Sequence, residues 1–161
     1  MITGLAHTAV CVPDVDAAVR WYESVLGLRA LSPPYRMEGD AITRDMDELV
    51  PAPVVVKAAI VGIDATDRVL EIIEYPEAGA AAPERTRSII EPGITHIGLV
   101  CDDIDAERAR LASHDVEFLT RGIASIAGVR TTWFSDPWGV VFILVEKSRP
   151  ARPYWRQLGP D

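Results

Sequence analysis

The segment GLAHTAVCVPDVDAA, residues 4–18, occurs a second time in the chain as GITHIGLVCDDIDAE, residues 93–107. At a constant offset of 89 residues, both copies contain a glycine, a histidine three residues later, an apolar stretch and the sequence Asp-apolar-Asp-Ala. His7 therefore corresponds to His96, and Asp14 corresponds to Asp103. Such self-similarity is typical of a repeated supersecondary unit, so the sequence predicts two related modules.

Each copy predicts a strand, then a helix, then further strands. Residues 5–12 are apolar and partly β-branched, Asp14 is a suitable helix N-cap, and Gly27 ends an amphipathic stripe. In the second copy, Asp103 is the expected cap of a helix that ends near His114. Extended runs separated by turn residues follow each helix, at 28–31, 53–62 and 68–75, and then at 116–120, 123–126, 131–134 and 140–146.

The fold class expected from this order is α+β, with two βαβββ modules in tandem. The first module covers residues 1–76, a linker rich in Ala and Pro covers 77–92, and the second module covers 93–146. The tail, residues 147–161, contains three prolines and is expected to wrap over a surface or a partner subunit. With 161 residues, the modules are expected to form one compact domain.

Composition excludes several classes of function. The 16 basic and 24 acidic residues give a net charge of −8, so no basic surface is available for nucleic acid. Apolar stretches are far shorter than a membrane span, and the first residues lack a basic signal region. The two cysteines, Cys11 and Cys101, are too few for a disulfide scaffold and are expected to be small buried hydrophobes. These features favour a cytoplasmic protein.

The paired modules, with a histidine on each first strand and a carboxylate on a closing strand, resemble the vicinal oxygen chelate superfamily of glyoxalases, bleomycin-resistance proteins and extradiol dioxygenases. The resemblance implies curved mixed sheets around a cup that binds a divalent metal ion. Carried over by position, the metal ligands are His7, Glu71 and His96. The fourth position falls on Ile143, which cannot bind a metal ion.

The residues themselves favour the same three ligands. Side chains alternate along a strand, so the small residues Ala9 and Gly98 share a face with His7 and His96 and leave room for a metal ion and a substrate. An unpaired carboxylate at Glu71 on an apolar face would be costly, and a metal ion would relieve that cost. Fe, Mn, Co, Ni or Zn would suit this donor set. Alternatively, the three residues are hydrogen-bonded in a cup that has lost its metal.

Three further residues are candidates for the site. Lys57 lies near the position where epimerase-like relatives place a general base. One alternative is a functional role as a catalytic base or an anion anchor, and the other is a side chain that reaches solvent at a strand edge. Tyr35 and Arg36 lie in the insertion between residues 32 and 52, where relatives contact substrate. Ile143 would give the substrate pocket an apolar surface.

The expected function is that of a metal-dependent, glyoxalase-like enzyme on a small oxygenated substrate. It would be either a lyase or isomerase that works by enolisation, or a ring-cleaving dioxygenase. Ile143 argues against a standard glyoxalase I or methylmalonyl-CoA epimerase. The alternative is a metal-free binding protein of the bleomycin-resistance type. A homodimer is expected, with Tyr154 and Trp155 of the tail covering the contact.

Overall fold

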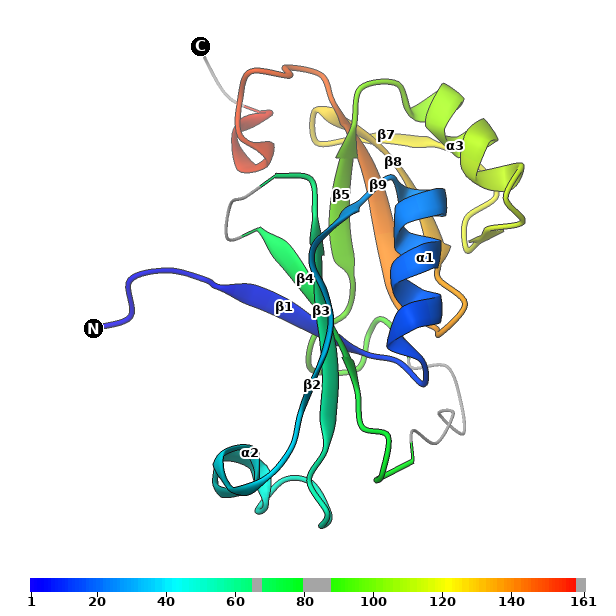
Figure 1. Cartoon of the computed structure of the whole chain (residues 1–161). Helices are drawn as coiled ribbons and strands as arrows, with labels where there is room; N and C mark the ends of the chain where they lie inside the picture. Colours follow the sequence, from blue (N-terminus) through cyan, green and yellow to red (C-terminus); the bar gives the residue numbers. More distant parts are fainter. Residues whose placement is uncertain (65–67, 80–87, 159–161) are drawn as a thin grey trace. The chain divides into compact units, whose positions relative to one another are not determined.

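A computed structural model describes residues 1–64, 68–79 and 88–158 (Figure 1). The chain divides into two compact units, Met1–Pro83 and Glu84–Asp161. Residues 80–87 of the expected linker and residues 159–161 of the expected tail lie outside the described residues.

The first unit contains one mixed sheet with the strand order β1-β4-β3-β2. Strands β1 and β4 are parallel, whereas β3 is antiparallel to both of its neighbours. The chain runs from β1 to β4 through α1, β2, the short helix α2 and β3, which is the βαβββ order with one additional short helix. The elements are β1 (His7–Cys11), α1 (Val15–Leu26), β2 (Arg29–Met37), α2 (Asp40–Met46), β3 (Val56–Gly62) and β4 (Val69–Glu74).

The second unit repeats this topology with the strand order β5-β9-β8-β6, and the additional short strand β7 pairs with β8. Strands β5 and β9 are parallel, as β1 and β4 are. The structure thus confirms the α+β class and the paired βαβββ modules. The elements are β5 (Ile97–Cys101), α3 (Ile104–Ala112), β6 (Glu117–Phe118), β7 (Ala124–Ile126), β8 (Val129–Ser135), β9 (Val141–Lys147) and the 3₁₀ helix η1 (Tyr154–Arg156).

Helix α1 begins and ends where its sequence predicts. The side chain of Asp14 accepts a hydrogen bond from the backbone N–H of Ala17 at 2.9 Å, and Gly27 ends the helix with φ at 68°, a conformation that glycine adopts without strain. The apolar face packs against β2, β3 and β4. The buried residues of this face are Val15, Ala18, Val19, Tyr22 and Val25.

Helices α1 and α3 are each fixed to the sheet of their own unit by the same arrangement of charges. In the first unit, Glu74 on β4 accepts a hydrogen bond from Val15 N at 2.9 Å. In the second unit, Glu146 on β9 accepts one from Ile104 N at 2.8 Å. A carboxylate at a helix N-terminus satisfies a free N–H and opposes the positive end of the helix dipole, so each closing strand stabilises its own helix.

A basic residue on the neighbouring strand completes each arrangement. Lys57 on β3 pairs in register with Glu74 and forms an ion pair with Asp16 on α1. Arg130 on β8 pairs with Glu146 at 3.2 Å and with Asp105 on α3 at 2.7 Å. The two arrangements match pair by pair, so the repeat extends to Lys57 and Arg130, where the two copies differ in sequence.

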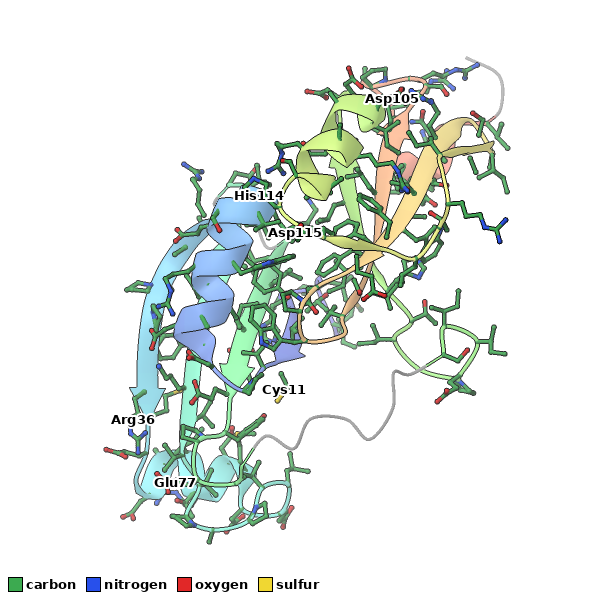
Figure 2. The ribbon with its side chains drawn as sticks, turned by 90° about the vertical axis from the view of Figure 1, so that its right-hand side faces the viewer. Cys11, Arg36, Glu77, Asp105, His114 and Asp115 are labelled. Carbon is green, nitrogen blue, oxygen red and sulfur yellow. The ribbon has the colours of Figure 1, made fainter. Side chains whose placement is uncertain are left out.

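The residues between Ser32 and Ala52, which only the first module has, extend β2 to Met37 and form the short helix α2. The expectation that both cysteines are buried was wrong for Cys11, which is exposed, whereas Cys101 is half-buried (Figure 2). The pleat of β1 explains this outcome, because it directs Cys11 away from the face that α1 covers. Within the described residues, no helix has the length and apolar character of a membrane span.

Candidate metal site

The candidate site in the first unit is the pair of His7 and Glu71 on the sheet face opposite α1. Strands β1 and β4 are parallel with Ala9 beside Glu71, so His7 and Glu71 extend from the same face. His7 Nε2 lies 3.2 Å from Glu71 Oε2. The exposed fraction of the side chain is 47% for His7 but only 16% for Glu71, so the carboxylate is the better shielded member. The structure therefore brings two of the three expected ligands together.

The surroundings of Glu71 on this face are small or apolar. Ile60 on β3 lies opposite Glu71, and Val69 and Ile73 precede and follow it on the same face of β4. Tyr75 lies further along the same face. Burial raises the pKa of the Tyr75 hydroxyl above its usual value, and the nearby Cys11 and Glu71 raise it further. Glu71 thus combines a partly desolvated carboxylate with a single close nitrogen partner.

The third expected ligand, His96, lies in the second unit just before β5. Its Nδ1 is 2.7 Å from the hydroxyl oxygen of Thr95. Its ring also packs against Trp133 on β8 in an edge-to-face arrangement, with ring centroids 4.7 Å apart and the planes at 71°. Because Thr95 takes up Nδ1, the ring nitrogen that remains available for a metal ion is Nε2.

Ile143 occupies the position in the second unit that Glu71 occupies in the first. Gly98 pairs with Ile143 in the parallel register of β5 and β9, as Ala9 pairs with Glu71. Ile143 is 9% exposed and belongs to an apolar cluster with Val129, Val145 and Trp133. The carboxylate of the first unit is therefore replaced by a hydrocarbon surface.

Lys57 lies on the other face of the first sheet, among the residues that fix α1. Its hydrogen bond with Asp16 is the largest cause of a raised pKa at Lys57, and Glu74 lies 3.9 Å from its Nζ. A general base at neutral pH needs a lowered lysine pKa. The position and the direction of the shift therefore favour the structural role of Lys57 over that of a base.

The pleat of β2 separates the two neighbouring residues expected to line the substrate pocket. Tyr35 pairs with Ala58, which places it on the face that carries His7 and Glu71. Arg36 pairs with Lys57 on the opposite face and contacts Glu38 at 2.9 Å and Glu77 at 3.6 Å (Figure 2). The hydrogen bond with Glu38 is the main cause of a raised pKa at Arg36. Of the two residues, only Tyr35 lies on the face of His7 and Glu71.

The donor chemistry of this face fits a divalent metal ion. His7 offers a nitrogen and Glu71 an oxygen, a combination that suits Fe, Mn, Co, Ni or Zn. Across residues 1–64, 68–79 and 88–158, no three or more His, Cys, Asp or Glu side chains form a complete metal-binding group. A metal ion on this face would need a further ligand besides His7 and Glu71, and His96 is the one that the sequence predicts. Neither Thr95 nor Trp133 is among the predicted site residues. Thr95 is adjacent to His96 in the sequence, whereas the contact of Trp133 with His96 depends on strand pairing.

Comparison with known proteins relates this chain to a protein family. The model of the Glyoxalase/Bleomycin resistance protein/Dioxygenase superfamily matches residues 4–144. A 2-epi-5-epi-valiolone epimerase of Actinomyces sp. is 31% identical over 150 residues, which cover 86% of this chain and 76% of that protein.

Solved structures show the same fold. A glyoxalase family protein from Bacillus cereus superposes with a TM-score of 0.78 at 18% identity, over 91% of this chain and 95% of that one. The antibiotic-binding protein TnmS3 from Streptomyces sp. CB03234 gives 0.58 at 23% identity, over 91% and 98%. The repeat, the strand order and the family match together establish that the chain belongs to the Glyoxalase/Bleomycin resistance protein/Dioxygenase superfamily.

Proposed function

We propose that this protein is a metal-dependent isomerase that moves a proton on a carbon atom next to a carbonyl group, most closely as an epimerase does. The observation that carries the proposal is the His7–Glu71 pair on the face opposite α1. The similarity to an epimerase whose substrate is named as a valiolone, a ketone by its suffix, supports this reaction over other chemistries of the superfamily.

In this proposal His7, Glu71 and His96 hold one divalent metal ion, with His96 contributed by the second module of the same chain or of a second copy. If two neighbouring oxygens of the substrate bound to such an ion, the ion would polarise the carbonyl and acidify the adjacent C–H bond. Fe, Mn, Co, Ni and Zn all suit two nitrogen donors and one oxygen donor, so this ligand set does not select one of these metals.

In this proposal Glu71 removes the proton from the substrate carbon, and a proton from solvent water is delivered to the opposite face of that carbon to complete the epimerisation. Glu71 Oε2 faces His7, so Oε1 is the oxygen free to receive a proton from the substrate carbon. The carboxylate of Glu71 has low exposure, and Ile60 and Ile73 provide an apolar wall beside it. Tyr35, on the same face and 37% exposed, is expected to contact the substrate.

The test compares Glu71→Gln with Glu74→Gln, two identical substitutions on the two faces of β4. The measurement is incorporation of deuterium from D₂O into a panel of hydroxyketones, followed by proton NMR with protein of known metal content. Glu71→Gln should lower the exchange rate by at least about 100-fold, as expected for loss of a positioned proton acceptor. Glu74→Gln should keep the rate and lower only stability, because Glu74 binds the helix N-terminus. Equal rates in the Glu71→Gln variant and the wild type would contradict the proposal.

A second candidate function is binding of an apolar compound without metal. The cluster of Val129, Ile143, Val145 and Trp133 favours it, because Ile143 gives the second unit an apolar side chain at the position equivalent to Glu71. TnmS3, which shares the fold, is named as an antibiotic-binding protein. Elemental analysis of protein purified without chelator or affinity-tag metal separates the two candidates, since only the enzyme needs about one metal ion per chain.

The same preparation tests the third expected chemistry. Oxygen consumption with catechols, measured with an electrode, would identify a ring-cleaving dioxygenase. The proposed isomerase should exchange deuterium and consume no oxygen.

A further inference from the structure

His96 is held by two neighbours that have no counterpart at His7. Thr95 precedes it and places a hydroxyl oxygen 2.7 Å from Nδ1, whereas the equivalent of Thr95 in the first module is Ala6. Trp133 packs against the imidazole in an edge-to-face arrangement, whereas the equivalent position on β3 is Ile60. The second module therefore orients its histidine through different contacts from those in the first module.

The difference follows from the residue opposite each histidine. In the first unit Glu71 reaches His7 Nε2 directly, so the carboxylate itself sets the direction of the ring. In the second unit the equivalent residue is Ile143, which can neither donate nor accept a hydrogen bond. An exposed imidazole with no polar partner would rotate freely and exchange between its two neutral tautomers, so it would offer a metal ion a poorly defined ligand.

We propose that Thr95 and Trp133 are positioning residues for His96: the hydroxyl of Thr95 accepts a hydrogen bond from Nδ1–H, and the indole of Trp133 fixes the ring plane. This leaves Nε2 unprotonated and directed outward as the coordinating nitrogen. Ligating histidines are usually held in this way through their second ring nitrogen. Gly98, next to Ile143 in register, adds no side chain on this face that would obstruct Nε2.

The inference rests on the proposed function only for the metal ion that Nε2 would bind, and its first test uses metal-free protein. Chelator-treated full-length protein with ¹⁵N-labelled histidine is studied by long-range ¹H–¹⁵N NMR at about pH 9, where an ordinary imidazole is neutral. The wild type should show His96 as the Nδ1–H tautomer. Thr95→Val should transfer population to the Nε2–H tautomer, and Thr95→Ser should retain the wild-type spectrum because it keeps the hydroxyl.

Trp133 is tested by the ring-proton shifts of His96 in the same spectra. Trp133→Leu should abolish the shift that the indole ring current causes, and Trp133→Phe should keep part of it. Trp21→Leu is the matched control, because Trp21 lies on α1, which packs on the sheet face opposite His7 and Glu71. A wild-type His96 in the Nε2–H tautomer, or a Thr95→Val spectrum identical to that of the wild type, would overturn the inference.

Binding of Co²⁺, followed by its visible absorption, provides the second readout. Thr95→Val and Trp133→Leu should each weaken binding by about tenfold, the lower end of the range for residues that orient a ligand. Thr95→Ser and Trp21→Leu should bind as the wild type does. If the wild type bound no Co²⁺, the proposed metal-dependent function would fail, while the tautomer of the metal-free protein would still decide the role of Thr95.

Discussion

Replacing Ile143 with glutamate recreates in the second module the carboxylate that the first module has at Glu71. The register supports this substitution, because Gly98 lies beside Ile143 as Ala9 lies beside Glu71. The His7–Glu71 distance of 3.2 Å indicates that a carboxylate at this register position reaches the histidine at the start of the neighbouring strand. We therefore expect the new glutamate to approach His96 and to supply a fourth metal ligand.

The magnitude follows from the surroundings of Ile143, which is 9% exposed among Val129, Val145 and Trp133. Removing the buried isoleucine side chain costs about 1.5–3 kcal/mol, and a poorly paired buried carboxylate brings the total to about 3–5 kcal/mol. For a chain of this size, each kcal/mol lowers Tm by roughly 2–4 °C. The metal-free Ile143→Glu variant should therefore melt about 6–20 °C below the wild type. Coordination of the carboxylate should restore most of this difference when metal is present.

The assay is thermal unfolding followed by circular dichroism, with and without a divalent metal ion, for the wild type, Ile143→Glu and Ile143→Gln. The glutamine variant is the matched control, because it has nearly the same size and polarity but lacks an anionic ligand. Metal should raise the Tm of the glutamate variant well above that of the glutamine variant. If the glutamate variant lost the same stability with and without metal, the assignment of this strand to the metal site would be wrong.

Three further predictions follow from the described contacts. Glu146→Gln should lower the free energy of unfolding by about 1–2 kcal/mol in a urea titration, because it weakens the hydrogen bond to Ile104 N at the start of α3, and metal content should not change. Burial raises the pKa of the Cys101 thiol to about 11, and nearby acidic residues add to the shift. Its alkylation by iodoacetamide at pH 8, followed by mass spectrometry, should be about 100-fold slower than that of an ordinary thiol and should accelerate about tenfold per pH unit; an ordinary rate at pH 8 would show that the thiol is not shielded. Light scattering should give twice the 17.6 kDa of one chain, and deletion of residues 154–158 should shift the equilibrium toward monomer; a monomer at micromolar concentration would exclude the homodimer.

The sequence determined the features that depend on neighbouring residues. The offset of 89 residues aligned His7 with His96, and the alternation of apolar residues set the order of strands and helices. The caps Asp14 and Asp103 act as predicted, since each accepts a hydrogen bond from the N–H three residues later. Capping and pleating are local effects, so a linear pattern is enough to reveal them.

Only the tertiary structure decided which chemical groups meet across the sheets. Lys57 and Arg36 looked like site residues in the sequence, but the register of β2 and β3 places both on the face away from Glu71. The sequence also gave no sign that Glu74 and Glu146 would accept hydrogen bonds from helices 59 and 42 residues away in the chain. Such contacts depend on strand register and on bulges such as the two in β2, and a shift of one residue transfers a side chain to the opposite face. The partners of a side chain therefore depend on pairing over long sequence distances, which local patterns do not encode.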